Sequence, residues 1–184
     1  MNIPIKFGTD GWRGVIADTF TFENVRYAAQ ATAEYFKTVE KTERAVFIGF
    51  DVRFQSSKFA HAAAEVFAGN GFRVVMMDRP YPTPYVSFEV RRRKFAGGIM
   101  ITASHNPAIF NGFKVKAHFG GSATPAITAK IEEKIRGQTG EFPFFELPKK
   151  GIHPDHRAGE ILQRAYEVAG RLGSDFKVQT EDRG

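Results

Sequence analysis

Apolar and polar residues alternate along this chain in blocks that predict strands and helices in turn. Short apolar runs, typical of strands buried on both faces, occupy residues 45–50 and the start of 99–102, and a mostly apolar run at 72–77 predicts a further strand. Apolar residues at helical spacing between and before these runs predict helices over residues 22–38, 57–67 and 85–94. Because strands and helices alternate, we expect an α/β fold: a three-layer α/β/α sandwich with a mixed, mostly parallel sheet of about four strands.

The signals that start and stop helices support these boundaries. Thr21 is a plausible N-cap for the first helix, and Gly69-Asn70-Gly71 tolerates the positive φ that ends the second. Residues 112–116 alternate apolar and charged side chains, which predicts a strand with Lys114 and Lys116 on a solvent-facing side. A turn at 120–122 and a helix from Pro125 to about Arg136 complete the pattern.

Composition narrows the class of protein. The 184 residues suit one domain, which we place at 1–150, followed by a divergent tail at 151–184 with one possible amphipathic helix over 157–172. The absence of cysteine excludes disulfides and thiolate chemistry. No long apolar run predicts a membrane span, and the N-terminus has no signal-peptide pattern, so we expect a cytoplasmic protein that binds no membrane.

The formal charge of +6 favours anionic partners without identifying one. The densest basic run, 91–94, ends a predicted helix, where cations are favourable and usually solvated. A nucleic-acid site would need a wider basic stripe with stacking aromatic residues, and none is evident. We therefore expect no nucleic-acid partner.

The candidate chemistry lies in Thr102-Ala103-Ser104-His105-Asn106-Pro107, directly after a buried strand. Ligands bind at the carboxyl ends of strands in open α/β sheets, so Ser104 and His105 would face a site at that rim. A Ser–His hydrolase is one interpretation. Adjacent residues seldom aim their side chains at each other, however, and no Gly-x-Ser-x-Gly elbow is present.

Phosphoryl transfer fits the surrounding residues better, because it needs mainly positioned cations and hydrogen-bond donors. Lys114 and His105 lie close to Ser104 in the sequence, although a surface role is the ordinary expectation for this lysine. The glycine-rich segment 8–14 contains Arg13, whose guanidinium suits bidentate contact with phosphate. A tight turn is an equally ordinary reason for those glycines.

Four segments together resemble the α-D-phosphohexomutases, the phosphoglucomutase/phosphomannomutase superfamily. They occur in the family's order at 7–14, 49–57, 102–107 and 111–114, and the resemblance covers roughly residues 3–150. It implies that the chain is the first of four domains. It also implies that hexose phosphates, such as glucose or mannose 1- and 6-phosphate, are the substrates, with hexose 1,6-bisphosphate as intermediate and activator.

The resemblance assigns roles to particular residues. Ser104 would carry the phosphoryl group, and its phosphate would also ligate Mg²⁺. His105, Lys114 and Arg13 would surround the phosphoserine as acid/base and electrostatic groups. Thr9, Asn106 and Arg53 would support the loop. Arg53 and Ser56 would contribute more remotely, with a structural role at least as expected for both.

Much of the family's site is absent from this sequence. The Asp-Gly-Asp-Gly-Asp-Arg metal loop, the sugar-recognition loop and the distal phosphate loop belong to domains II–IV and do not occur here. We therefore expect weak Mg²⁺ binding and no substantial mutase turnover from the chain alone. The alternatives are a non-catalytic remnant or an interaction module that pairs with separately made remaining domains. Glucose, mannose and glucosamine phosphates all stay open as substrates, with Trp12 weakly favouring the first two by resemblance.

The tail suggests a further hypothesis. With the reading frame shifted forward by one nucleotide, codons for 168–176 permit a segment resembling the junction between domains I and II. The tail would then derive from a frameshift. The DNA tests this: the shifted frame must continue into the Asp-Gly-Asp-Gly-Asp metal loop.

Overall fold

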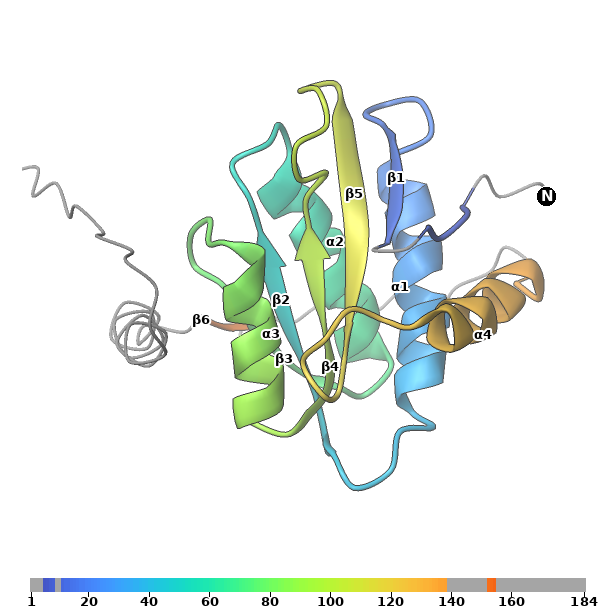
Figure 1. Ribbon diagram of the computed structural model, residues 1–184, viewed down its shortest axis with the longest axis vertical. Helices are drawn as coiled ribbons and strands as arrows, with labels where there is room; N and C mark the ends of the chain where they lie inside the picture. The colour runs from blue at the N-terminus through green and yellow to red at the C-terminus, as the bar shows by residue number, and fades with distance from the viewer. Residues whose placement is uncertain (1–4, 9–10, 139–151, 155–184) are drawn as a thin grey trace, which may run out of the picture. The chain divides into compact units, whose positions relative to one another are not determined.

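The computed structural model describes residues 5–8, 11–138 and 152–154, which form a sheet between layers of helices (Figure 1). The strands are β1 (Trp12–Val15), β2 (Glu43–Phe50), β3 (Arg73–Met76), β4 (Phe95–Ile101), β5 (Phe110–Ala117) and β6 (Ile152–Pro154). The helices are α1 (Phe22–Phe36), α2 (Ser56–Gly69), α3 (Thr83–Arg92) and α4 (Pro125–Arg136). The predicted tail helix at 157–172 lies outside the described residues.

The sheet is mixed, with strand order β1-β5-β4-β2-β3-β6. Strands β4, β2, β3 and β6 run parallel to one another, whereas β5 pairs antiparallel with both β4 and β1. The fold class and the mixed, mostly parallel sheet are therefore as predicted. The sheet has two more strands than the expected four, because β1 and β6 are short and include polar residues or glycine, so neither gives an apolar run in the sequence.

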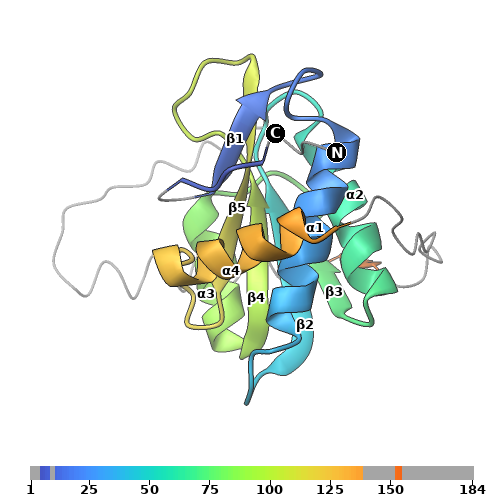
Figure 2. The same ribbon diagram turned by 90° about the vertical axis from the view of Figure 1, so that its right-hand side faces the viewer.

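Two consecutive glycines of β4 show how the layers form. A Cβ on Gly97 would lie 2.1 Å from the ring of Phe36 in α1, whereas one on Gly98 would lie 2.7 Å from Val90 in α3. Adjacent residues of a strand point to opposite faces, so α1 and α3 cover opposite faces of the sheet. Figure 1 shows α3 in front of the sheet with α1 and α2 behind it, and Figure 2 shows α4 beside α1.

The predicted helix signals act as expected. The Thr21 side chain accepts a hydrogen bond from the Asn24 N–H at 3.1 Å, which caps α1. Gly71, with φ of +79°, follows the end of α2. No helix among the described residues is long and apolar enough to cross a membrane.

The expected solvent-facing side of β5 is wrong, because Lys114 and Lys116 are buried, with exposed fractions of 5% and 6%. After the turn, the chain folds back along β5, where the Ala123 N–H donates to the Val115 carbonyl at 2.9 Å. The Lys116 amine donates to the Ser122 hydroxyl at 2.9 Å. A lysine can bury its aliphatic stem when its amine has a polar partner. The alternation of apolar and charged residues was therefore not enough to show which side of β5 faces solvent.

The basic run 91–94 is only partly a solvated surface. Arg92 and Arg93 both pair with Glu89, whose side chain is fully buried in α3. A buried carboxylate needs such partners, since an unpaired buried charge is costly. Part of the positive charge therefore neutralises an internal acid.

Candidate active site

Ser104 lies in the loop of residues 102–110, which leaves the carboxyl end of β4 and returns as β5. Thr102 and Ala103 are buried, whereas Ser104 and His105 are exposed. The backbone of Ser104 is left-handed, with φ of +58°. Its N–H donates to the Thr102 hydroxyl at 2.9 Å, a contact that holds this strained residue in place.

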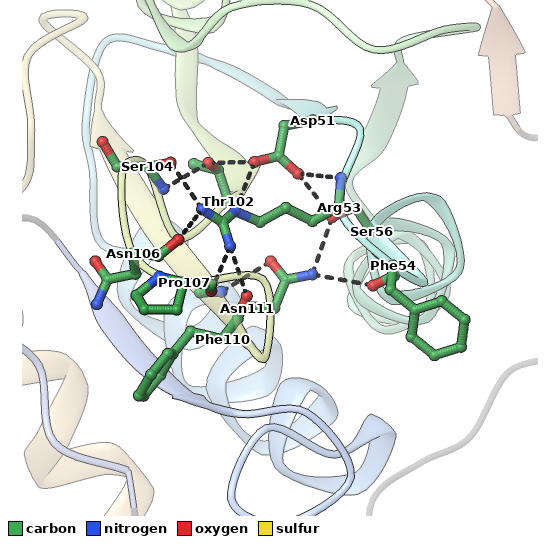
Figure 3. Close-up of polar contacts among 11 residues, drawn as sticks. Asp51, Arg53, Phe54, Ser56, Thr102, Ser104, Asn106, Pro107, Phe110 and Asn111 are labelled. Atoms are coloured by element: carbon green, nitrogen blue, oxygen red, sulfur yellow. Dashed lines mark hydrogen bonds and ion pairs between the residues drawn. The ribbon is translucent and has the colours of Figure 1, made fainter.

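Arg53 holds the same loop through its guanidinium, as Figure 3 shows. This group donates to four backbone carbonyls, those of Ser104 (2.8 Å), Asn106 (2.6 Å), Pro107 (2.9 Å) and Phe110 (3.0 Å). Hydrogen bonds from a charged donor are stronger than neutral ones, and four of them converge here. The loop shape therefore depends on a side chain about fifty residues earlier in the sequence.

The four hydrogen bonds from Arg53 to the loop carbonyls of Ser104, Asn106, Pro107 and Phe110 are called the Arg53 clasp below. Asp51 connects this clasp to the sheet and to α2. Its carboxylate accepts hydrogen bonds from the Thr102 hydroxyl, from the Ser56 hydroxyl (2.8 Å) and from the Arg53 N–H (3.0 Å). The Arg53 Nε lies 3.3 Å from the same carboxylate. Asp51 directly follows β2, Ser56 begins α2 and Thr102 follows β4, so one carboxylate ties three elements together.

Asn111 extends the network into the protein interior. This side chain is fully buried, and its amide nitrogen donates to the Ser56 hydroxyl at 2.9 Å. Its amide oxygen accepts the N–H of Gly112 at 2.9 Å. A buried amide satisfied on both sides fixes where β5 begins relative to α2.

Arg13 and Lys114 lie on one face of the sheet together with Gly112. Arg13 pairs directly with Gly112, and a Cβ on that glycine would lie 3.1 Å from the Arg13 Cγ and 2.5 Å from the Thr102 carbonyl. Lys114, two residues further along β5, points to the same face. The glycine thus permits Arg13 to lie beside the start of the Ser104 loop.

The structure brings together some of the predicted site residues and not others. Arg53 and Asn106 belong to the same network, in which Asn106 contributes its backbone carbonyl. Among the described residues, the Ser104 hydroxyl forms no hydrogen bond with His105, Lys114 or Arg13. Thr9 lies outside the described residues.

Sequence reasoning missed Asp51, Thr102 and Asn111 as partners of the Ser104 loop, and it gave Ser56 only a remote or structural role. The available signal was their occurrence in the same short segments that carry the resemblance. A side-chain network across three elements leaves no periodic pattern, however, so the individual contacts were not predictable.

The described residues do not fit a complete Mg²⁺ site. They contain no group of three or more histidine, cysteine, aspartate or glutamate side chains able to hold a metal ion. Asp51, the carboxylate that belongs to the network around the Ser104 loop, is already engaged by Arg53, Thr102 and Ser56. Hard divalent cations need several oxygen ligands, so further ligands would have to come from elsewhere.

The match to a known family gives the class of this protein, and the fold agrees with it. Residues 4–141 match the family described as phosphoglucomutase/phosphomannomutase, alpha/beta/alpha domain I, and the chain belongs to that family.

Particular relatives agree with this assignment. The chain is 40% identical over 144 residues to a probable phosphoribomutase of Schizosaccharomyces pombe, covering 73% of this chain and 24% of that protein. It is 36% identical over 183 residues to a phosphoglucomutase of Staphylococcus saprophyticus, covering 92% of this chain and 32% of that protein. The crystal structure of a putative phosphomannomutase from Thermus thermophilus matches with a TM-score of 0.77 and 36% identity. The match covers 94% of this chain and 36% of that chain. The chain therefore spans only about a third or less of each relative.

Proposed function

We propose that this chain acts as the phosphoserine-bearing first domain of a phosphohexomutase, with Ser104 as the residue that carries the phosphoryl group. The observation that carries the proposal is the clasp of Arg53 on four carbonyls of the 104–110 loop. It presents an exposed serine in a fixed left-handed conformation at the carboxyl end of a central strand. Group transfer through a serine requires such positioning.

The proposed reaction exchanges one phosphate ester for another. A hydroxyl oxygen of a hexose phosphate attacks the phosphorus on Ser104, a bond from sugar oxygen to phosphorus forms, and the bond from Oγ to phosphorus breaks. The hydroxyl proton passes to a general base, and the serine oxygen takes a proton from a general acid. The resulting hexose 1,6-bisphosphate reorients and returns its other phosphate to Ser104 by the reverse steps.

His105, Lys114 and Arg13 are the groups proposed to assist this transfer. Negative charge spreads over the phosphoryl oxygens in the transition state, so nearby cations lower its energy. The position of Arg13 beside Gly112 and the Thr102 carbonyl supports an electrostatic role. Lys114 faces the same side of the sheet as Arg13, and His105 directly follows the serine.

Because the described residues lack a metal site and the chain spans 24–36% of these relatives, we propose that the isolated chain has no substantial mutase turnover. Domains II–IV would supply the remaining Mg²⁺ ligands and the sugar contacts. The choice among glucose, mannose and glucosamine phosphates would also lie there.

A chimera tests the role of Ser104. Residues 1–154 replace the corresponding segment of the Thermus thermophilus protein, and turnover of glucose 1-phosphate and mannose 1-phosphate is followed in a coupled assay. We expect turnover from the chimera and from its Ser57→Ala variant, which alters an exposed serine outside the network. Ser104→Ala should abolish turnover, and the isolated chain should show none. Activity retained in Ser104→Ala would refute the assigned role.

An interaction module is the second candidate, because three large apolar side chains are exposed beside the clasp. Val52, Phe54 and Ile109 have exposed fractions of 87%, 68% and 60%, and Figure 3 shows the Phe54 ring pointing away from the polar network. Val52 and Phe54 flank Arg53, whereas Ile109 lies in the loop that Arg53 holds. Grouped exposed apolar residues often mark interfaces.

Titration calorimetry of this chain against separately made domains II–IV of the Staphylococcus saprophyticus protein tests that module. We expect binding that weakens at least tenfold in Phe54→Ser. Phe119→Ser, which alters an exposed phenylalanine outside this group, should bind like the wild type. If no binding occurs, or if both variants weaken it equally, the module is excluded.

A further inference from the structure

The four carbonyls held by Arg53 fix the direction of the peptide N–H groups that follow them. The C=O of one residue and the N–H of the next point in opposite directions across a trans peptide, and the described chain has no cis peptide bond. The N–H of His105 shares its peptide with the Ser104 carbonyl, so it points away from the guanidinium. The Asn106 carbonyl is followed by Pro107, which has no N–H.

Three other N–H groups of this loop have acceptors inside it. The Ser104 N–H donates to the Thr102 hydroxyl, the Asn106 N–H to the Ala103 carbonyl at 3.1 Å, and the Phe110 N–H to the Pro107 carbonyl at 3.0 Å. Within the described residues, the His105 N–H has no hydrogen-bond acceptor, and His105 is exposed. It is therefore an available backbone donor directly after the serine.

We propose that Arg53 is a positioning residue that turns the His105 N–H toward a phosphoryl group carried by Ser104. The inference rests on the proposed function and names a donor that the side chains do not reveal. A phosphate oxygen accepts strongly from a backbone N–H, and loops that expose such groups bind anions. Arg53 itself does not touch the phosphate, because its guanidinium is occupied by the carbonyls and by Asp51.

The arrangement also turns carbonyl dipoles toward a cation. Each carbonyl that accepts from Arg53 has its negative end directed at the guanidinium. Without the guanidinium, those peptides are free to rotate, and a carbonyl facing a phosphate dianion is repelled. Arg53 therefore acts on the phosphate through the backbone. A substitution of Arg53 should disturb the hydrogen bond from the His105 N–H to the phosphate while leaving the sheet intact.

Nuclear magnetic resonance of the full ¹⁵N-labelled chain tests this, with phosphoserine placed at position 104 by genetic encoding. This preparation needs no mutase activity, so its result is independent of the chimera assay. The second ionisation of phosphoserine has a pKa of about 6. In the wild type we expect the His105 amide proton to move downfield as the dianion forms, with the largest pH-dependent shift in the 102–110 loop.

Variants then separate positioning from general folding. Arg53→Met should lose most of this pH-dependent shift while the amides of β2 and β4 keep their positions. Arg53→Lys should restore part of it, since an ammonium group binds one or two carbonyls. Arg73→Met, which changes an exposed arginine on β3, should behave like the wild type. A wild-type His105 amide that does not follow the phosphate, or an equal response in Arg53→Met, overturns the inference.

Discussion

Replacing Asn111 with alanine tests how far the buried network determines stability. Its side chain is fully buried and satisfies two interior groups, the N–H of Gly112 and the hydroxyl of Ser56, each at 2.9 Å. A third contact, to the Phe54 carbonyl, is weaker at 3.4 Å. Asn111→Ala removes all three and leaves the Gly112 N–H without its acceptor.

The expected loss follows from these contacts. A buried polar group that loses its partner costs about 1–3 kcal/mol. Leaving the Gly112 N–H without an acceptor should account for most of the lost stability, because the Ser56 hydroxyl keeps its hydrogen bond to Asp51. We therefore expect Asn111→Ala to lower the free energy of unfolding by about 2–4 kcal/mol. Domains of this size have only about 5–15 kcal/mol in total, so the effect is large.

Urea unfolding followed by tryptophan fluorescence measures this change. Trp12 is the single tryptophan, is 2% exposed and stacks on Phe20 with ring centroids 4.7 Å apart, so it reports loss of tertiary structure. The midpoint should fall with the slope unchanged. The matched control is Asn106→Ala, in the same loop, whose side chain forms no hydrogen bond among the described residues. Equal losses in the two variants, or a loss under about 0.5 kcal/mol in Asn111→Ala, would contradict the reasoning.

Three further predictions concern packing, backbone conformation and pH. Gly97→Ala places a methyl group 2.1 Å from the Phe36 ring and should lower the free energy of unfolding, measured in urea, by at least about 1–3 kcal/mol. Adding Phe36→Leu should recover part of this loss, and simple additivity of the two changes would argue against the contact. Gly11→Ala meets a φ of +116° and the Phe113 carbonyl at 2.5 Å, so its thermal midpoint should fall, and an unchanged midpoint would be inconsistent with that geometry. Burial raises the pKa of Tyr35 above 10.0, so the folded state favours the neutral phenol, and its contribution to stability is complete below pH 10.0 and declines as pH rises through the higher folded pKa. Tyr35→Phe should lessen this alkaline loss, as measured by unfolding at several pH values, and an identical pH profile would count against it.

The sequence predicted those parts of the fold that depend on local pattern. Residues 45–50 and 99–102 are apolar runs buried on both faces, and they lie in or next to β2 and β4. Thr21 and Gly71 marked helix boundaries because capping and positive φ are properties of single residues. β1 was missed, since Trp12–Val15 holds a charged residue and a glycine, gives no apolar run and gains its place through pairing with β5.

The sequence predicted where the Ser104 loop begins but not the contacts that hold it, and the chemical roles of its residues stay predictions. Ser104 was located because it follows a buried strand, which is a local signal. The clasp of Arg53 joins residues about fifty positions apart, and its acceptors are backbone carbonyls, which have no sequence signature. Lys114 was wrongly predicted to be exposed for a related reason, since the chain that covers β5 arrives only after the turn.

β1 pairs with β5, its neighbour in the sheet but a strand about one hundred residues later in the sequence, and this affects how the protein folds during synthesis. Trp12 lies opposite Phe113, and Arg13 opposite Gly112, so the first strand has no partner until most of the domain has been made. Contacts between such distant residues form late, because the chain must first close a long loop. The parallel core of β2, β3 and β4 can form earlier from residues closer in sequence. Arg13 therefore reaches the Ser104 loop only once β5 is available, and a nascent chain stalled before β5 emerges would hold a core without the edge that carries this arginine.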